Sequence, residues 1–187
     1  GFYIFLSDLQ TGSIANLNIL ILGFLKGDLA VGIFSIADKI IRAFSNLQLP
    51  VINTMFPYLS GLNNNVKSEN VIYKTLKWGV LLLIPVLTSM YFLADYIFLI
   101  IFGEVIPESV IVFKILLLFP LFSFCNQVVG KLNFIAKGNM FLYFQIVAAS
   151  TIINLIMCYI LTYKFGFTGT AFNVISIELV VTFGMFY

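Results

Sequence analysis

Histidine is absent from this 187-residue sequence, and cysteine occurs only twice, at Cys125 and Cys158. These two residue types supply most protein zinc sites, and here the cysteines lie in separate apolar segments without a CxxC spacing. A zinc site and a disulfide framework are therefore not expected, and the cysteines should behave as small apolar side chains. The sequence predicts neither a metal nor a cofactor.

Charged residues are scarce. They make up 10% of the chain, against 61% hydrophobic residues, and the formal net charge is +2. The mean hydropathy is +1.07. A soluble domain has roughly 45–50% apolar and about 25% charged residues, so this chain lacks the polar surface to fold in water. We expect an integral membrane protein, and the scattered lysines and arginines do not indicate a nucleic-acid site.

Motifs for enzymatic chemistry are missing as well. The sequence has no phosphate-binding loop, no glycine-rich dinucleotide turn and no metal-ligand spacing. No two carboxylates are placed for acid–base work. We therefore expect that the protein is not an enzyme.

Long apolar runs dominate what is present, and a transmembrane helix needs about 20 such residues. The predicted membrane-spanning helices are approximately residues 3–25, 30–59, 76–102, 110–135, 140–163 and 169–187. Glycine, asparagine and proline concentrate in the short connectors between them. Membrane strands would show stretches of about 10 residues with alternating polarity, and these runs are longer and continuous. The predicted fold class is an all-α integral membrane protein with six transmembrane helices in one unit, residues 1–187.

The lysines in the connectors predict the orientation of these helices. Lys67, Lys74 and Lys77 surround the second connector, and Lys131 and Lys137 surround the fourth. Cytoplasmic connectors carry the excess of Lys and Arg, so both should be cytoplasmic. The first helix would then start in the cytoplasm and the sixth would return to it.

The two ends of the chain are those expected of a fragment. It begins with Gly1, without a basic segment and a cleavage site of small residues, and it stops inside an apolar run. We expect a piece of a longer multi-pass protein.

Polar residues within the second window, 30–59, are ordered rather than scattered. At 100° per residue they form a stripe about 60° wide, with Asp38 at its edge. The stripe consists of Ser35, Lys39, Arg42, Asn46 and Asn53. Asp38 and Arg42 are spaced i,i+4, so an ion pair within the helix is expected, and Asp8 on the first helix is a candidate partner for Lys39.

Three other helices carry polar stripes, which include Asn18, Asn126 and Asn154. A Lys or Arg at the bilayer centre costs at least about 2.5–3.5 kcal/mol, so these groups should face a partner or water. One interpretation is that the charges pair internally and only hold helices together. The other is that helices one, two, four and five face a hydrated, cationic cavity. A stripe of five turns favours the cavity, because two packed helices need fewer polar contacts.

The run NILILGFLKGDLAVGIFSIADKIIRAFSNLQLPVINTMFPYLSGL, residues 18–62, resembles the polysaccharide transporters, the Wzx-type flippases of lipid-linked oligosaccharides. Their corresponding helices typically read I-L-G-x-x-x-G-x-x-x-V-G-x-Y-S-x-A-x-K-I, followed by F-P near the helix end. The matching residues are Ile21, Leu22, Gly23, Gly27, Val31, Gly32, Ser35, Ala37, Lys39, Ile40, Phe56 and Pro57. Phe34 departs from the pattern, since the family often has Tyr there.

The resemblance implies the multidrug/oligosaccharidyl-lipid/polysaccharide exporter superfamily, whose members have two six-helix lobes around a cavity that opens to alternate sides. This chain would be the C-terminal lobe of a multi-pass protein of the bacterial cytoplasmic (inner) membrane. The implied function is to flip undecaprenyl-pyrophosphate-linked oligosaccharide units for O-antigen (lipopolysaccharide), capsule or exopolysaccharide synthesis. Implied partners are the lipid-linked substrate, membrane lipid, a polysaccharide polymerase, a chain-length regulator, and H⁺ or Na⁺ as coupling ion.

Within this framework Lys39 and Arg42 are the expected contacts of the pyrophosphate or acidic sugars. Asn46, Asn53 and Asn126 would donate hydrogen bonds to sugars. Asp8 and Asp38 would either couple to ions or hold the basic side chains in place.

Three alternatives remain open. A multidrug or cation antiporter of the same superfamily should have a mainly acidic cavity, whereas this stripe is basic. A membrane glycan polymerase should have a large external loop with essential Arg or His. A purely structural membrane subunit would not need the polar stripes.

Overall fold

The structure, a computed structural model, describes residues 2–61, 65–130 and 140–186; the side chains of residues 2–15, 56, 60, 65–67, 140 and 186 lie outside the description. Within these ranges the chain is helical and contains no strand. The helices are α1 (Phe2–Asn46), α2 (Leu49–Ser60), α3 (Asn65–Phe92), α4 (Ala94–Phe102), α5 (Pro107–Leu116), α6 (Phe119–Gln127) and α7 (Met140–Phe186). An all-α protein is therefore confirmed.

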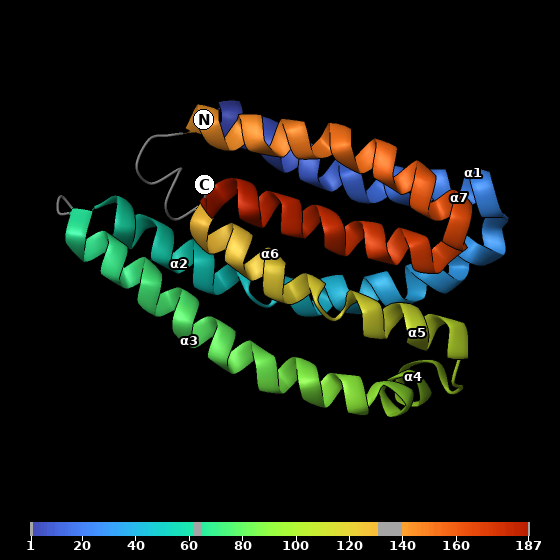
Figure 1. Cartoon of the computed structure of the whole chain (residues 1–187). Coiled ribbons are helices and arrows are strands. Elements are labelled where there is room, and N and C mark those ends of the chain that lie inside the picture. Colours follow the sequence, from blue (N-terminus) through green and yellow to red (C-terminus); the bar gives the residue numbers. More distant parts are fainter. Residues whose placement is uncertain (1, 62–64, 131–139, 187) are drawn as a thin grey trace.

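Four stretches of the described chain are long and apolar enough to cross a membrane. They are Asn16–Leu59, Ser68–Phe92, Pro107–Gly130 and Phe141–Met185. The first and last contain 44 and 45 residues, about twice what one crossing requires. Figure 1 shows why: α1 and α7 each run along the molecule, reverse direction at the right-hand end and return.

A single glycine makes each reversal. Gly27 interrupts α1 with φ 79° and ψ 178°, and Gly166 interrupts α7 with φ 61° and ψ −137°. Side chains with a Cβ are strained in this part of φ/ψ space, which glycine enters freely. Both glycines fall in connectors predicted from the sequence, 26–28 and 164–169, so these two predicted turns are confirmed.

Two prolines interrupt helices that the sequence predicted as continuous. Pro50 stands in the first turn of α2 and Pro120 in the first turn of α6, after short turns that end α1 and α5. Proline lacks a backbone N–H, so it fits the start of a helix better than its interior. The windows 30–59 and 110–135 are therefore corrected to pairs of helices, although residues 131–135 lie outside the described ranges. The two breaks meet, since Gln48 Nε2 donates a hydrogen bond to the Pro120 carbonyl at 3.2 Å.

The third window also differs from the structure. The sequence predicted a helix from residue 76 to residue 102, whereas α3 begins at Asn65 and a turn at Leu93 separates it from α4. Hydropathy marks only the part of a helix that can lie in hydrocarbon, and residues 65–75 are too polar for that criterion. The helix continues through them because its backbone bonds do not depend on side-chain polarity.

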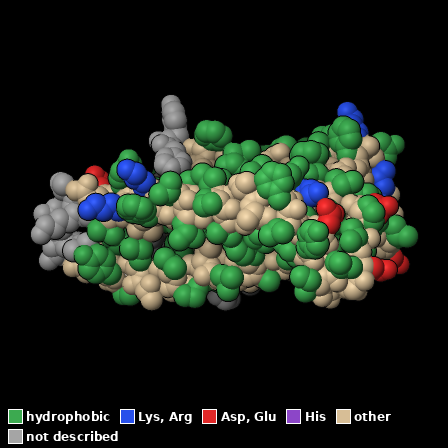
Figure 2. Space-filling model, turned by 90° about the horizontal axis from the view of Figure 1, so that it is seen from below, with side chains coloured by type: hydrophobic (Ala, Val, Ile, Leu, Met, Phe, Trp, Pro, Cys, Tyr) green, Lys and Arg blue, Asp and Glu red, His purple; other side chains and the backbone are tan. Residues whose placement is uncertain are grey.

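The helices pack around an apolar core, and the contact between α1 and α7 is the largest. Fully buried side chains include Phe34, Phe98 and Phe113, and the last two rings meet edge to face with centroids 5.6 Å apart. Many large apolar side chains remain exposed, as expected of a surface that faces lipid or further protein. Figure 2 shows hydrophobic side chains over the middle of one face and charged side chains toward its two ends.

The arrangement of the ends agrees with the predicted topology. The left-hand end of Figure 1 holds the first turns of α1 and α3 and the last turns of α2 and α7, and the right-hand end holds the bends of α1 and α7 and the α4–α5 connection. Which end faces the cytoplasm stays a prediction from the lysines.

The turn at Gly27 provides a test of this fold. We expect Gly27→Ala to destabilise the protein by about 1–3 kcal/mol, because alanine is strained at this φ and ψ. Gly32→Ala is the matched control, since an added Cβ there meets no atom within 4 Å and the residue is helical. Thermal unfolding of the two variants in detergent measures the difference, and equal melting temperatures would contradict the proposed role of Gly27.

Candidate functional site

The ion pair predicted within the second window is present. Arg42 Nε donates to Asp38 Oδ2 at 2.7 Å across one helical turn of α1. Asp38 is buried, while about one third of the Arg42 side chain is exposed. The Arg42 guanidinium also lies over the ring of Phe119 on α6, 5.1 Å from its centroid. This pair and its aromatic neighbour connect α1 to α6.

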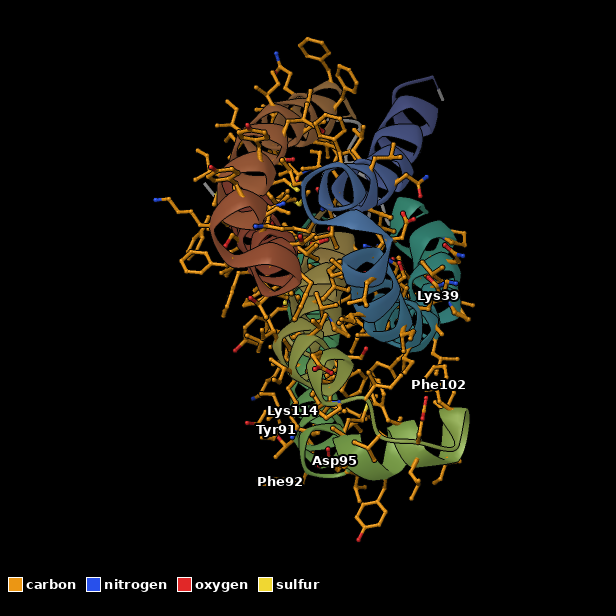
Figure 3. All side chains as sticks on the ribbon, turned by 90° about the vertical axis from the view of Figure 1, so that its right-hand side faces the viewer. Lys39, Tyr91, Phe92, Asp95, Phe102 and Lys114 are labelled. Carbon is orange, nitrogen blue, oxygen red and sulfur yellow. The ribbon has the colours of Figure 1, made fainter. Side chains whose placement is uncertain are left out.

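Lys39 is in a different environment from Arg42, although only three residues separate them. Its side chain is exposed, and no carboxylate of the described side chains forms an ion pair with it. The side chain of Asp8, its other candidate partner, lies outside the description. Figure 3 places Lys39 beside the α1–α2 part of the molecule, away from the other labelled charges. Lys39 is thus a cation presented on the surface of a membrane-spanning stretch.

Asn46 and Asn53 are exposed as well, but they belong to different helices. Asn46 is the last residue of α1, and Asn53 lies in α2 beyond the break at Leu47 and Gln48. The predicted stripe assumed one uninterrupted helix, so the 100° count does not set the direction of Asn53 relative to Lys39. The interruption by Pro50 is the physical reason.

Asn126 is buried and bonded to α7. Its Nδ2 donates to both the backbone carbonyl and the carboxylate of Glu178, and its Oδ1 accepts a hydrogen bond from the Thr182 hydroxyl at 2.7 Å. Arg42 lies near enough to interact electrostatically with Glu178. Asp38, Arg42, Asn126 and Glu178 therefore form a polar centre between α1, α6 and α7. A sugar contact for Asn126 stays a prediction.

Glu178 is the member of this centre that sequence reasoning missed. The sequence alone offered no partner for it, because Asn126 lies 52 positions earlier. The polar stripe of the fourth window, 110–135, could have indicated such a partner. Its side chains would face hydrocarbon unless a polar group of another helix lay against them. A carboxylate in a membrane span needs such a partner.

A second polar network lies in the core between α1 and α7. Asn154 Nδ2 donates to Asn18 Oδ1 at 3.0 Å, and Asn173 Nδ2 donates to Asn154 Oδ1 at 2.7 Å. All three side chains are buried. The sequence placed Asn18 and Asn154 in stripes that should face a cavity, whereas in the structure these two side chains are bonded to each other. These asparagines join both limbs of α7 to α1.

A third cluster marks the right-hand end of the bundle. Lys114 Nζ lies 3.9 Å from Asp95 Oδ2 and 5.4 Å from the centroid of the Tyr91 ring. Figure 3 shows the three side chains together at the end of α3. The pair is partly exposed, where ion pairs contribute little to stability. Aromatic and charged side chains at one level are typical of a membrane–water interface.

Among the side chains that the structure describes, no group of three or more Cys, Asp or Glu residues is placed to hold a metal ion. The polar side chains therefore offer ion pairing and hydrogen bonding as their chemistry.

The asparagine network generates a stability prediction. Asn154→Leu removes both hydrogen bonds and leaves Asn18 and Asn173 without their partner. Hydrogen bonds between membrane helices contribute roughly 0.6–1.7 kcal/mol each, so we expect a loss of about 1–3 kcal/mol. Asn53→Leu, at an exposed position, should leave the melting temperature unchanged. If both variants melt alike in detergent, the network does not stabilise the fold.

Comparison with known proteins places the chain in a family. Residues 1–111 match the family model "Polysaccharide biosynthesis protein". Two relatives carry the name "Putative O-antigen transporter": one from Shigella dysenteriae, 24% identical, and one from Escherichia coli strain K12, 27% identical. Each alignment covers 97% of this chain, and 46% and 44% of the respective relative, so the chain spans less than half of their length. No solved structure matches the chain.

The family match includes the whole motif at residues 18–62 from which the resemblance was argued, together with α1, α2, α3 and α4. It covers more than half of the 187 residues. An all-α, multi-pass membrane protein with apolar helices agrees with relatives that are named as transporters. The chain belongs to the family of polysaccharide biosynthesis proteins.

Proposed function

We propose that this chain is one six-helix lobe of a flippase that moves undecaprenyl-pyrophosphate-linked oligosaccharide across the bacterial cytoplasmic membrane. The family match and the names of the relatives support a role in O-antigen or polysaccharide transport. Because α1 and α7 reverse at Gly27 and Gly166, each would cross the bilayer twice. With one crossing each by Ser68–Phe92 and Pro107–Gly130, this gives six crossings in all. A second lobe, outside this chain, would complete the cavity, and rocking of the lobes would give alternating access.

The exposed ammonium group of Lys39 is the observation that carries the proposal. A lysine in a membrane-spanning stretch is costly against lipid, so an exposed one should face water or an anion. A pyrophosphate needs such a cation, and its sugars need hydrogen-bond partners, while the lipid tail can remain in the bilayer. Lys39 would meet the pyrophosphate or an acidic sugar in the cavity between the lobes.

Arg42 would have two tasks. Its bond to Asp38 uses Nε, and a guanidinium has four further N–H donors on its terminal nitrogens. Asp38 and the Phe119 ring orient the group, and its partly exposed side leaves donors for a second anion. Asp38 would thus act as a positioning residue for Arg42.

The amide side chains differ in how available they are. Asn46 and Asn53 are exposed and would donate hydrogen bonds to sugars. Asn126 would reach a sugar only if its bonds to Glu178 and Thr182 exchanged during transport. Asp8 and Asp38 stay candidates for coupling to H⁺ or Na⁺, and Glu178 joins them as a carboxylate inside a membrane span.

An antiporter for cationic drugs is the second candidate function. It would use carboxylates facing the cavity, and Asp38 and Glu178 are both engaged with neighbours while Lys39 is exposed. A membrane glycan polymerase has less support, since α4 and α5 are joined by residues 103–106 alone. A polymerase and a chain-length regulator would instead be partners of the flippase.

Lys39→Ala in the native, full-length protein tests this proposal. Losing one charge-assisted hydrogen bond of about 1.5–3 kcal/mol should lower transport at limiting substrate by roughly tenfold or more. Lys39→Arg should restore much of the activity, and Lys77→Ala, at an exposed position of α3, should have no effect. Surface glycan is the readout, with membrane insertion checked in parallel. Full activity of an inserted Lys39→Ala protein would refute a cationic cavity at this residue.

Exchange of the ion pair separates the two tasks of Arg42. Asp38→Arg combined with Arg42→Asp keeps an i,i+4 pair but moves the guanidinium away from the ring of Phe119. Because Asp38 is buried, insertion and melting temperature are measured in parallel, and a double variant that is inserted and stable should still lose surface glycan. Unchanged transport by the double variant would mean that the pair is purely structural and that Arg42 meets no ligand.

A further inference from the structure

A groove opens where α1 and α2 diverge from α3. It has a volume of about 620 Å³ and lies between Phe44, Leu47 and Val51 on one side and Trp78, Leu82 and Val86 on the other. Figure 1 shows the end of α2 and the start of α3 close together at the left-hand end, and the two helices separate toward the middle of the bundle. Phe124 of α6 closes the floor, where its ring lies against Gly79 so closely that a Cβ on residue 79 would overlap it.

The lining of this groove is almost entirely apolar. Its polar members are Gln48, Lys74 and Thr75. Thr75 already donates to the Val71 carbonyl and to Met55 Sδ, and Gln48 Nε2 is bonded to the Pro120 carbonyl. Lys74 is exposed and forms no ion pair with the described side chains, so it is the free charge of the groove.

The depth of the groove follows from the interfacial residues of α3. Tyr73, Lys74 and Trp78 mark one membrane–water interface, and the cluster of Asp95 with Lys114 marks the other. At 1.5 Å per residue, α3 extends about 26 Å from Lys74 to Tyr91, whose ring lies beside Lys114 in that cluster, and this is close to the roughly 30 Å thickness of the hydrocarbon.

From Lys74 to Val86 the groove extends about 18 Å along α3, and one leaflet of the hydrocarbon is about 15 Å deep. The apolar part of the groove therefore begins at one interface, next to a lysine, and ends a few Å beyond the midplane.

We propose that the groove binds one anionic phospholipid of the leaflet at the α2–α3 end. One acyl chain would fill the groove between α2 and α3, and the phosphate group would pair with Lys74. The length of the groove favours a phospholipid, because an acyl chain that starts at the interface beside Lys74 ends near the midplane, within a few Å of the end of the groove at Val86. The site lies between α2 and α3. The proposal requires only that these helices lie in the bilayer, and it does not rest on the proposed function.

Two matched pairs of variants test the site in the native, full-length protein. Leu82→Trp should block the groove, while Leu81→Trp changes an exposed neighbour that does not line it. Lys74→Gln removes the proposed phosphate contact, while Lys77→Gln removes an exposed lysine of α3 outside the groove. Lys77 and Leu81 lie outside the groove lining, and the side chains at all four positions are exposed, so the variants should fold.

Lipid retained by the purified protein is measured by native mass spectrometry, with phosphatidylglycerol, phosphatidylethanolamine and a polyprenyl phosphate as probes. We expect one phosphatidylglycerol per protein, lost at least tenfold in Leu82→Trp and unchanged in Leu81→Trp. Lys74→Gln should weaken phosphatidylglycerol binding about fivefold, as expected for one lysine near an anionic lipid, and should weaken phosphatidylethanolamine binding less, because the ammonium group of that lipid offsets its phosphate charge.

Three results would overturn the proposal. Equal phosphatidylglycerol retention by all variants would show that the groove holds no specific lipid. Displacement of phosphatidylglycerol by polyprenyl phosphate in a manner that depends on Leu82 would assign the groove to the carrier lipid. A photo-crosslinker at position 82 that captures another segment of the native protein would show that protein covers the groove.

Discussion

Hydrocarbon offers no hydrogen-bond partner, and this constraint determines how the helices of the chain meet. Each buried polar side chain therefore needs a partner, either on its own helix or on another one. Asn154 is hydrogen-bonded to Asn18 and to Asn173, and these bonds join both limbs of α7 to α1. Asn126 is hydrogen-bonded to Glu178 and to Thr182, and these bonds join α6 to α7. Apolar packing completes these contacts but cannot select them, because lipid tails are as apolar as leucine.

Lys39 departs from this pattern, and the departure gives it functional weight. Arg42 and Asp38 satisfy one another within a helical turn, and the Phe119 ring covers the guanidinium. Lys39 is exposed three residues away, without an ion pair among the described side chains. An exposed charge in a membrane-spanning stretch is costly against lipid, which is why we propose that Lys39 faces an anionic ligand or water in a cavity.

Two prolines shape the part of the bundle where α1 is followed by α2 and α5 by α6. Pro50 and Pro120 begin new helices, and Gln48 joins the two breaks through the Pro120 carbonyl. The change of direction between α1 and α2 separates them from α3 and leaves the groove lined by Trp78 and Leu82. We infer that the helix breaks at Pro50 and Pro120 leave a groove whose length is close to the depth of one leaflet.

Much of this protein could be predicted from the sequence, because hydropathy and i,i+4 spacing are local properties. The apolar runs determined an all-α membrane protein, Gly27 and Gly166 marked real turns, and the spacing of Asp38 and Arg42 determined their ion pair. Contacts between distant positions were decided only by the tertiary structure: the partner of Glu178, the facing of Asn18 and Asn154, and the exposure of Lys39 beside a satisfied Arg42. A helical wheel shows that polar residues share one face of a helix. Whether that face meets another helix, lipid or water depends on how the helices pack, which no single segment contains.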